Sequence, residues 1–473
     1  MLTFKKNKMK KYLYILCLTF LVFSCDREEY LDIQPKGQII PNKVDDYRLL
    51  LDQTLDFGGI SAGFVETFSG TEIASDDVMI TDNLSDNYPE GTPDVNIYTW
   101  SDNIFTQDQE DEDWQLLYGQ IYTANIVLEE ILDATNGTLQ EKLALKAEAQ
   151  AHRAFAYFIL VNLYGVHYNP ASVTTDLGVP LRLGTELVGI EFPRATIEDV
   201  YNLILDDLNE ALDNLPDTPE FVHRPSKAGV YSLLARVYLY MGEFQKAWEA
   251  SNNALLLSNT LVDFNTHPDW FFPGVVNPGD LPEDDAEIIW HKASNNTFSF
   301  RIASNDFLSL IAPNDQRRRR FAGPFLFGLG GTESIYATGF ARNFKEIGPS
   351  VPEMHLTRAE CSARLGNLSE ALNDLNTLRE MRVDTGTFTP FASADQTEVL
   401  NWIKTERRLE LIMKGHRFFD LKRYNVYDTP KTDLTHVFNG TTYTLNANST
   451  NWAFPIAAKY ILQSPEIGEN IRE

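Results

Sequence analysis

Cysteine is scarce in this 473-residue chain, which contains only Cys17, Cys25 and Cys361. Cys17 lies inside an N-terminal segment that has the layout of a cleaved signal, and Cys25 directly follows that segment. If Cys17 is removed with the signal and Cys25 carries lipid, Cys361 has no partner and the exported chain forms no internal disulfide. Its stability must then come from a hydrophobic core, for which 43% hydrophobic and 12% aromatic residues are ample.

The N-terminus also lacks an apolar run long enough to cross a bilayer as a helix. The run from Tyr12 to Phe23 falls short of the roughly 20 residues that a spanning helix needs. It follows five lysines and no acidic residue, a layout that is typical of an export signal. We therefore expect residues 1–24 to be a signal peptide. Met9 is an alternative start, because residues 9–25 already contain a complete signal.

The signal ends in a sequence that looks like a loose bacterial lipobox, Leu21-Val22-Phe23-Ser24-Cys25. In such a box the cysteine after the small residue is diacylated and becomes the mature N-terminus. We predict lipidation at Cys25; the alternative is an ordinary signal peptide followed by an incidental cysteine. The acidic stretch at residues 26–29 is then a solvated tether, and similar stretches accompany the surface export of lipoproteins.

Basic residues are outnumbered, with 40 Lys and Arg against 67 Asp and Glu. The full chain has a formal charge of −27, and loss of the five signal lysines leaves 35 basic against 67 acidic residues, or −32. Such a charge repels phosphate backbones and anionic lipid headgroups. Nucleic acid is therefore excluded as a partner.

Acidic runs are present, but none fits a calcium loop. The aspartates at 76–94 and 108–113 lack the alternating oxygen ligands and the sixth-position glycine of an EF-hand. We interpret them as helix caps and solvated loops, and we expect no cofactor.

The chain is loop-rich from Tyr30 to about residue 113, with one short helix expected over 45–55. From Trp114 onward, apolar residues recur at helical spacing over 114–132 and again over 141–164. His152 and Arg153 lie on the second of these helices, where we expect satisfied residues at the edge of the core rather than a functional pair.

Two segments have the offsets of tetratricopeptide units, in which small residues let two antiparallel helices approach each other. They are Ala235–Ala254 and Ala359–Leu378, and 141–216 is a more degenerate candidate pair. The units are not in tandem, because the interval from Leu261 to Val351 separates them. That interval is loop-rich, with one strand expected at Glu287–His291.

A charged and aromatic segment, Ile403 to Asn425, predicts an amphipathic helix that Gly415 ends and a packed turn from His416 to Asp420. Glu406 and Glu410 lie one helical turn apart beside two arginines, so we interpret the segment as structural. We likewise expect Arg317 to Arg320 to form salt bridges or to be solvated rather than to bind an acidic ligand.

The motif E-R-R-x-E-L-x-x-x-G-H-R-F-F-D-L-x-R within that segment resembles the C-terminal signature of the SusD/RagB family, with Lys414 where the family often has Glu. Other blocks follow the family order: W-x-x-L-Y-x-x-I-x-x-A-N from Trp114, A-x-x-x-R-A-x-x-Y-F-x-L-x-x-L-Y-G ending at Gly165, Leu177 to Pro180, and a closing Pro455-Ile456 segment. The resemblance extends over nearly the whole chain.

This resemblance implies a mostly α fold in which tetratricopeptide-like helix pairs support a loop-rich ligand face. We expect a single domain over 25–473, with a loop-rich part at 25–113, a helical scaffold at 114–260 and 351–425, a loop-rich insertion at 261–350 and a C-terminal segment at 426–473. The resemblance also implies a lipid-anchored protein of the outer-membrane surface that passes nutrients to a TonB-dependent transporter. Oligosaccharides are the family's usual ligands, and peptides are an alternative.

A glycan site needs flat aromatic rings for sugar C–H faces and polar groups for hydroxyls. Two loop stretches offer this mixture: Tyr98, Trp100 and Asn103, and Trp270 with Asn295, Asn296 and Phe298. We predict both as ligand-binding, on exposed rings; the alternative is that Trp100 and Trp270 are core residues.

Two other functional classes fit less well. A glycoside hydrolase needs two carboxylates about 5 or 6.5–9.5 Å apart in a cleft, but Glu406 and Glu410 lie among arginines with a structural role. A protein-assembly scaffold uses tandem repeats, whereas these are split. The sequence does not favour an enzyme.

Overall fold

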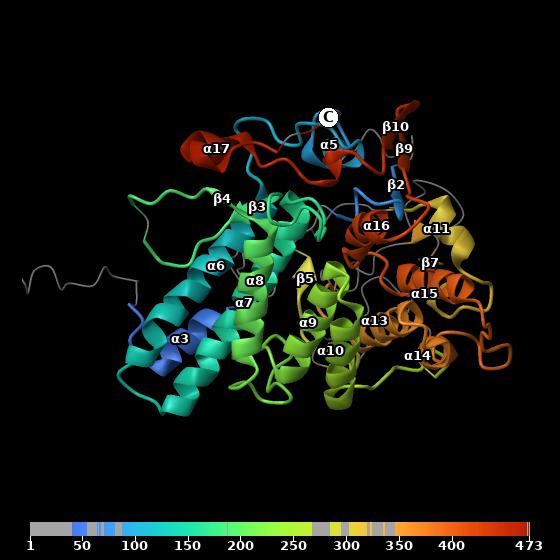
Figure 1. Cartoon of the computed structure of the whole chain (residues 1–473), viewed down its shortest axis with the longest axis horizontal. Helices are drawn as coiled ribbons and strands as arrows, with labels where there is room; N and C mark the ends of the chain where they lie inside the picture. The colour runs from blue at the N-terminus through green and yellow to red at the C-terminus, as the bar shows by residue number, and fades with distance from the viewer. Residues whose placement is uncertain are drawn as a thin grey trace, which may run out of the picture. The chain divides into compact units, whose positions relative to one another are not determined.

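A computed structural model describes the following residues: 40–53, 64, 66–67, 71–80, 88–186, 188–266, 284–294, 302–318, 322–323, 334–335, 346–470 and 472. The chain divides into two compact units, Met1–Asn42 and Lys43–Glu473. The helices and strands of the described residues all lie in the second unit (Figure 1).

The described chain is mostly helical, as the sequence predicts. Its helices are α3 (Val44–Leu51), α5 (Pro93–Tyr98), α6 (Glu112–Glu130), α7 (Leu139–Tyr164), α8 (Ile197–Ala211), α9 (Lys227–Met241), α10 (Phe244–Leu257), α11 (Asn305–Leu310), α13 (Val351–Arg364), α14 (Leu368–Glu380), α15 (Gln396–Glu410), α16 (His416–Tyr427) and α17 (Ala458–Gln463), with short 3-10 turns η1 (Ile131–Asp133), η2 (Thr450–Trp452) and η3 (Pro465–Ile467).

The strands are short and form two-stranded ladders. They pair as β1 (Glu66–Thr67) with β5 (Ala293–Ser294), parallel, and antiparallel as β2 (Val78–Met79) with β6 (Ile302–Ala303), β3 (Leu177–Pro180) with β4 (Arg194–Thr196), β7 (Ala322–Gly323) with β8 (Ser334–Ile335), and β9 (Leu434–Phe438) with β10 (Thr441–Leu445).

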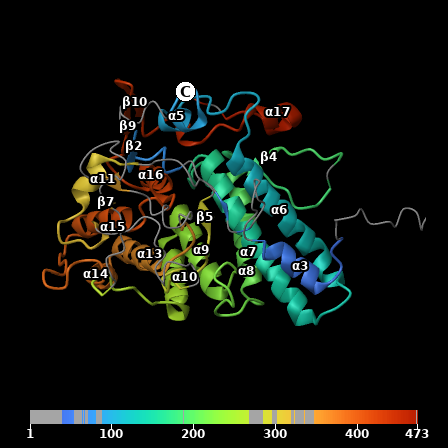
Figure 2. The same ribbon diagram turned by 180° about the vertical axis from the view of Figure 1, so that it is seen from behind.

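Helix α7 is the centre of the largest hydrophobic cluster. Thr138 and Glu141 form a capping box that fixes where the helix begins. From Leu145 onward nearly all of its residues are buried, because α6 packs on one side and α8 on another (Figure 2). His152 and Arg153 belong to this buried part, and Arg153 donates to both carboxylate oxygens of Asp207 at 2.8 Å. Both side chains are satisfied as expected, since His152 Nδ1 lies 3.0 Å from Lys292 Nζ. The position expected at the edge of the core holds for Arg153, whereas His152 is 2% exposed and lies inside the core.

The two predicted tetratricopeptide units form the helix pairs α9–α10 and α13–α14. Gly242 and Gly366 occupy the left-handed region, with φ of 76° and 87°, and let the chain reverse between the helices of each pair. Helix α10 packs on α13, so the pairs that lie far apart in the sequence are neighbours in the fold (Figure 1). The long interval between them is thus an insertion into a continuous scaffold.

Three local predictions need correction. The chain at Glu287–His291 is not a strand: only Ile288 forms an isolated bridge, with Ser350, and the nearest strand is β5. The predicted helix up to Gly415 ends at Glu410, where Leu411 leaves helical geometry with φ of −101° and ψ of 18°. Positive φ at Met413 and Gly415 then keeps the next residues out of the helix, and the predicted turn at His416–Asp420 is the beginning of α16. The short helix expected over 45–55 spans Val44–Leu51.

Candidate functional site

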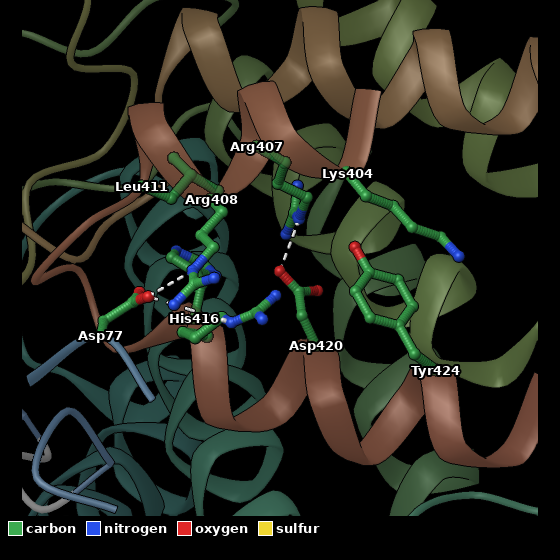
Figure 3. A pocket seen from close by; sticks show the side chains of 9 residues that line it. Asp77, Lys404, Arg407, Arg408, Leu411, His416, Asp420 and Tyr424 are labelled. Atoms are coloured by element: carbon green, nitrogen blue, oxygen red, sulfur yellow. Dashed lines mark hydrogen bonds and ion pairs between the residues drawn. The ribbon is translucent and has the colours of Figure 1, made fainter. Parts of the chain in front are cut away.

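The family-like motif places a dense group of charges between α15 and α16. Figure 3 shows side chains of the two helices facing each other around a small cavity, with Asp77 reaching in from the segment before β2. The lining residues carry four cations and two carboxylates: Asp77, Lys404, Arg407, Arg408, Leu411, His416, Arg417, Asp420 and Tyr424.

The charges in this group are paired with one another. Arg407 Nε donates to Asp420 at 2.7 Å, and Arg408 Nε donates to Asp77 at 2.6 Å. Arg417 Nε donates to the neighbouring Asp76 at 2.7 Å. The Arg407–Asp420 pair joins α15 to α16, and the other two pairs join these helices to the segment near residue 76, more than three hundred positions earlier in the chain. These are structural functions.

The cavity is too small for a sugar. Its volume is about 10 Å³. That is enough for about one water molecule and far below the roughly 300–1,000 Å³ of ligand pockets. Three buried polar atoms of its lining, Asp77 Oδ2, Arg407 Nη2 and His416 Nε2, have no hydrogen-bond partner within the described chain. Burial raises the pKa of Asp77 to about 6 against the pull of Arg408 and Arg417.

A second buried charge group holds the two glutamates of the motif. Arg317 Nη1 donates to Glu410 at 3.0 Å, and its Nη2 lies 2.7 Å from Glu406 and donates to Asp315 at 2.6 Å. Arg382 Nη2 donates to Glu410 at 2.9 Å. The salt bridging predicted for Arg317 is confirmed, and Glu406 and Glu410 are buried ion-pair partners rather than carboxylates in a cleft.

The predicted ligand stretch at 98–103 has a buried half and an exposed half. Tyr98 and Trp100 are buried, whereas Asn103 is exposed. The imidazole of His436 stacks between their rings, 4.0 Å from Tyr98 and 4.3 Å from Trp100, and Trp100 Nε1 donates to the carbonyl of Ala74 at 3.0 Å. The expectation that these two rings are exposed is therefore wrong, because His436 and the core already cover them.

The stretch is also tied to the C-terminal part of the chain. Asn451 Nδ2 donates to the carbonyl of Trp100 at 3.2 Å and to Asp102 at 3.1 Å, and Arg472 Nη2 donates to the carbonyl of Ser101 at 2.9 Å. Trp100 itself has φ of 51°, a conformation that a bulky residue adopts only where its surroundings hold it. The loop that presents Asp102 and Asn103 at the surface is thus rigidly supported.

Sequence reasoning did not identify His436, Asn451 or Arg472 as supports of this loop. In the structure the side chains of Leu434–Phe438 alternate between buried and exposed, which places His436 on the inner face with Leu434 and Phe438. The sequence does not signal this, because the polar His436 is buried and the apolar Val437 is exposed. Asn451 lies in the short 3-10 turn η2 and Arg472 in no helix or strand, so no periodic pattern predicts the direction of either side chain.

Five predicted site residues lie outside the described residues: Cys25, Trp270, Asn295, Asn296 and Phe298. Within the described part of the chain, His, Cys, Asp and Glu side chains form no group of three that could hold a metal ion. Across the same residues, no helix is both long and apolar enough to span a membrane.

Comparison with known families finds two matches in chain order. A SusD-like profile described as "starch-binding associating with outer membrane" matches residues 29–239, and the SusD family profile matches 352–466. Together they span the N-terminal half, the α9 region and both helices of the charged motif.

Individual relatives agree with these matches. One SusD-like protein of Formosa agariphila is 25% identical over 424 residues, covering 76% of this chain and 79% of its own. A second from the same organism is 23% identical over 509 residues and covers 90% and 92%.

The fold also matches solved structures. A SusD superfamily protein of Bacteroides thetaiotaomicron superposes with a TM-score of 0.71 at 20% identity, covering 91% of this chain and all of that one. A putative sugar-binding protein of Bacteroides vulgatus superposes with a TM-score of 0.71 at 19% identity, covering 92% and 99%. With the two ordered profiles and a matching helical scaffold, the chain belongs to the SusD/RagB family.

Proposed function

We propose that this protein is a lipid-anchored binding protein of the outer-membrane surface that captures oligosaccharides or polysaccharide fragments and delivers them to a TonB-dependent transporter. The observation that carries the proposal is the ordered match of two SusD profiles on one scaffold, the first of which describes starch binding in association with the outer membrane. The sugar-binding description of the Bacteroides vulgatus structural relative supports the same ligand class.

Catalysis has no part in this function. The chain belongs to a family of non-enzymatic carbohydrate-binding proteins and is not an enzyme. The two glutamates that are closest to a hydrolase pair in the sequence are neutralised in the core by Arg317 and Arg382.

The ligand face in this proposal combines the rigid 98–103 loop with the insertion. Asp102 and Asn103 supply exposed polar groups at a fixed position, and the buried Trp100 and Tyr98 hold that position from below. Trp270 and Phe298 supply the flat rings, and Asn295 and Asn296 add amide groups for hydroxyls. A rigid loop that presents polar groups is suited to glycan recognition, since little loop entropy is lost on binding.

A glycan array with the purified mature chain tests the ligand class, and a panel of short peptides run beside it tests the alternative. We expect at least one glycan to bind. Calorimetry with that glycan should then show that Trp270→Ala loses roughly 1 kcal/mol or more of binding free energy, with an unchanged melting temperature. Binding of peptides alone would replace glycans as the ligand, and normal affinity in Trp270→Ala would remove that residue from the site.

Lipidation at Cys25 supplies the anchor. Cys25→Ala should abolish incorporation of labelled palmitate and release the protein from the outer-membrane fraction, whereas Cys361→Ala, which changes the buried free thiol, should leave both unchanged. Unaltered labelling and fractionation of Cys25→Ala would refute the anchor.

A further inference from the structure

Three buried side chains around the cavity between α15 and α16 have the features of a ligand site. Arg407, His416 and Asp77 line the cavity and are at least nine-tenths buried (Figure 3). Arg407 Nη2, His416 Nε2 and Asp77 Oδ2 have no hydrogen-bond partner among the residues that the structure describes. Because a buried polar atom without a partner destabilises a fold, a species that binds to all three atoms would stabilise this one.

One connected set of ion pairs beside the cavity has more positive than negative charge. Within the described chain, four cations share three carboxylates in this set: Arg364, Lys404, Arg407 and Arg423 pair with Glu360, Asp420 and Asp428. One positive charge is thus in excess even when all three carboxyl groups are ionised. Since a buried charge is costly without a counter-charge, the excess favours an anion in the cavity.

The imidazole of His416 lies in a positive field. Burial holds the pKa of this ring well below its ordinary value, and the charges of Arg236, Arg407 and Lys414 lower it further. The imidazole is therefore uncharged. With its hydrogen on Nε2 it donates a hydrogen bond, as the Nη2 group of Arg407 does. Two donors in a positive field attract an anion.

The carboxyl group of Asp77 would repel an anion in its ionised form, but its surroundings favour the neutral form. Burial raises its pKa to about 6, Arg408 and Arg417 oppose the rise, and Asp76 adds to it. Arg408 comes from α15, and Arg417 comes from α16 together with the uncharged His416. Next to Asp77, β6 and α11 pack against the same segment through apolar residues. A neutral Asp77 has an O–H group that donates to an anion.

Protonation of Asp77 also increases the positive excess. Burial raises the pKa of Asp76, but Arg417 and Arg408 outweigh burial and hold that pKa below its ordinary value, so Asp76 stays ionised. Arg417 Nε donates to Asp76 at 2.7 Å, and Arg408 Nη2 lies 3.2 Å from it. Once Asp77 is neutral, Asp76 is the one ionised carboxylate that these two cations share in the described chain. A second positive charge is then in excess.

The size of the cavity limits the anion to a single atom. Its volume is about 10 Å³, which is enough for about one water molecule. Phosphate, sulfate and carboxylates carry several heavy atoms and do not fit. Chloride is the common monoatomic anion outside cells, and it is only slightly larger than water.

We propose that the cavity between α15 and α16 binds one chloride ion together with one proton. Arg407 Nη2 and His416 Nε2 donate to the chloride. The proton comes from solvent and lies on Asp77 Oδ2, which becomes the third donor. Chloride offsets the positive charge that this proton adds, and it joins α15, α16 and the segment before β2. The site does not depend on glycan binding or on the proposed function.

Bromide locates the site directly, because it replaces chloride and scatters X-rays anomalously. Crystals of the mature chain grown in sodium bromide at about pH 5, where Asp77 is mostly neutral, should show an anomalous peak. We expect it within hydrogen-bond distance of Arg407 Nη2 and His416 Nε2. An ordered water at this place without anomalous signal would overturn the inference.

Thermal unfolding tests whether the ion also binds in solution. Sodium chloride should raise the melting temperature by roughly 2 °C or more over sodium gluconate at equal ionic strength. The chloride affinity, taken from the concentration dependence, should be roughly tenfold or more tighter at about pH 5 than at about pH 8, because only the protonated site is competent. Equal melting in the two salts would mean an adventitious ion only and overturn the inference.

Two aspartate variants test the proton. Asp77→Asn is neutral at every pH, so its chloride affinity should no longer change between acidic and basic pH. The matched control is Asp111→Asn at the beginning of α6, since burial also raises the pKa of Asp111, to about 7. It should keep the pH dependence of the wild type. A pH dependence that persists in Asp77→Asn would overturn the inference.

Two histidine variants test the donor. His416→Phe removes the N–H group and should abolish the difference between chloride and gluconate. His416→Gln keeps an N–H donor and should retain part of that difference. Equal chloride stabilisation in wild type and His416→Phe would overturn the inference. If His416→Phe does not fold, the bromide peak of the wild type and the Asp77→Asn titration decide.

Discussion

Arg317 and Glu410 form a buried ion pair, with Arg317 Nη1 donating to Glu410 Oε2 at 3.0 Å. Arg317 comes from the insertion and Glu410 from the end of α15, so the pair joins the loop-rich part to the helical scaffold. Arg382 donates to the same carboxylate through both Nε and Nη2. Glu410 is therefore the shared partner of two buried cations.

Glu410→Ala should lower the free energy of unfolding by about 3–5 kcal/mol, because it leaves two buried guanidinium groups without their carboxylate. Glu406→Ala should cost less, since its Oε1 has an ion pair with Arg317 but no hydrogen bond. Glu380→Ala, an exposed position at the end of α14, is the control and should stay within about 0.5 kcal/mol of the wild type. Thermal and urea unfolding measure all three. A Glu410→Ala protein that melts like the wild type but loses glycan binding would move this group from scaffold to site.

The buried carboxyl group of Glu360 should make the stability of the fold depend on pH. Burial raises the pKa of this carboxyl group, but Arg423 and Arg364 outweigh burial and hold the pKa well below its ordinary value of 4.5. Because the pKa of Glu360 is lower in the folded than in the unfolded protein, its charged form stabilises the fold. This contribution is complete at a pH above the pKa of the unfolded state and is lost as the pH falls through the pKa of the folded state. The difference in stability between wild type and Glu360→Gln should thus be large at pH 7 and shrink progressively below about pH 4.5.

Melting curves of both proteins from pH 7 to pH 3 check this expectation. The comparison with the variant is necessary because Asp77 acts in the opposite direction, since burial raises its pKa to about 6. A difference that grows on acidification would show that the ion pairs do not favour the charged form of Glu360.

Trp100→Ala should destabilise the fold by roughly 3–5 kcal/mol, because it removes a buried ring from the stack with His436 and a hydrogen bond to Ala74. Asn103→Ala, at an exposed position three residues after Trp100, should change stability by less than about 0.5 kcal/mol. Under the proposed function it should nevertheless weaken glycan binding. If Trp100→Ala folds normally, the ring is not the support described here.

The sequence predicts the helices and the family of this protein well, because the amphipathic repeats and the motif around Glu406–Asp420 are local patterns. It does not predict that α10 packs on α13, since that contact depends on an insertion of about ninety residues that leaves no periodic signal. The sequence leaves open whether Trp100 is exposed or buried for the same reason: its covering residue, His436, lies far along the chain. Polar residues near a tryptophan indicate a surface site only when nothing distant covers the ring.

The contact between the two split helix pairs gives the last prediction. Arg236 of α9 donates to both carboxylate oxygens of Glu353 in α13, at 2.8 and 2.6 Å, and both side chains are buried. Arg236→Met alone should cost about 3–5 kcal/mol, because the Glu353 carboxylate is left buried without its cation. The double variant Arg236→Met/Glu353→Leu should recover much of that loss, since it buries no charge.

The matched control is the exposed pair of Lys227 and Asp217, at 3.1 Å, where removal of either charge should cost at most about 1 kcal/mol. A double variant that is no more stable than Arg236→Met would show that the scaffold needs the charges themselves to hold α9 against α13, and not only a filled core between them.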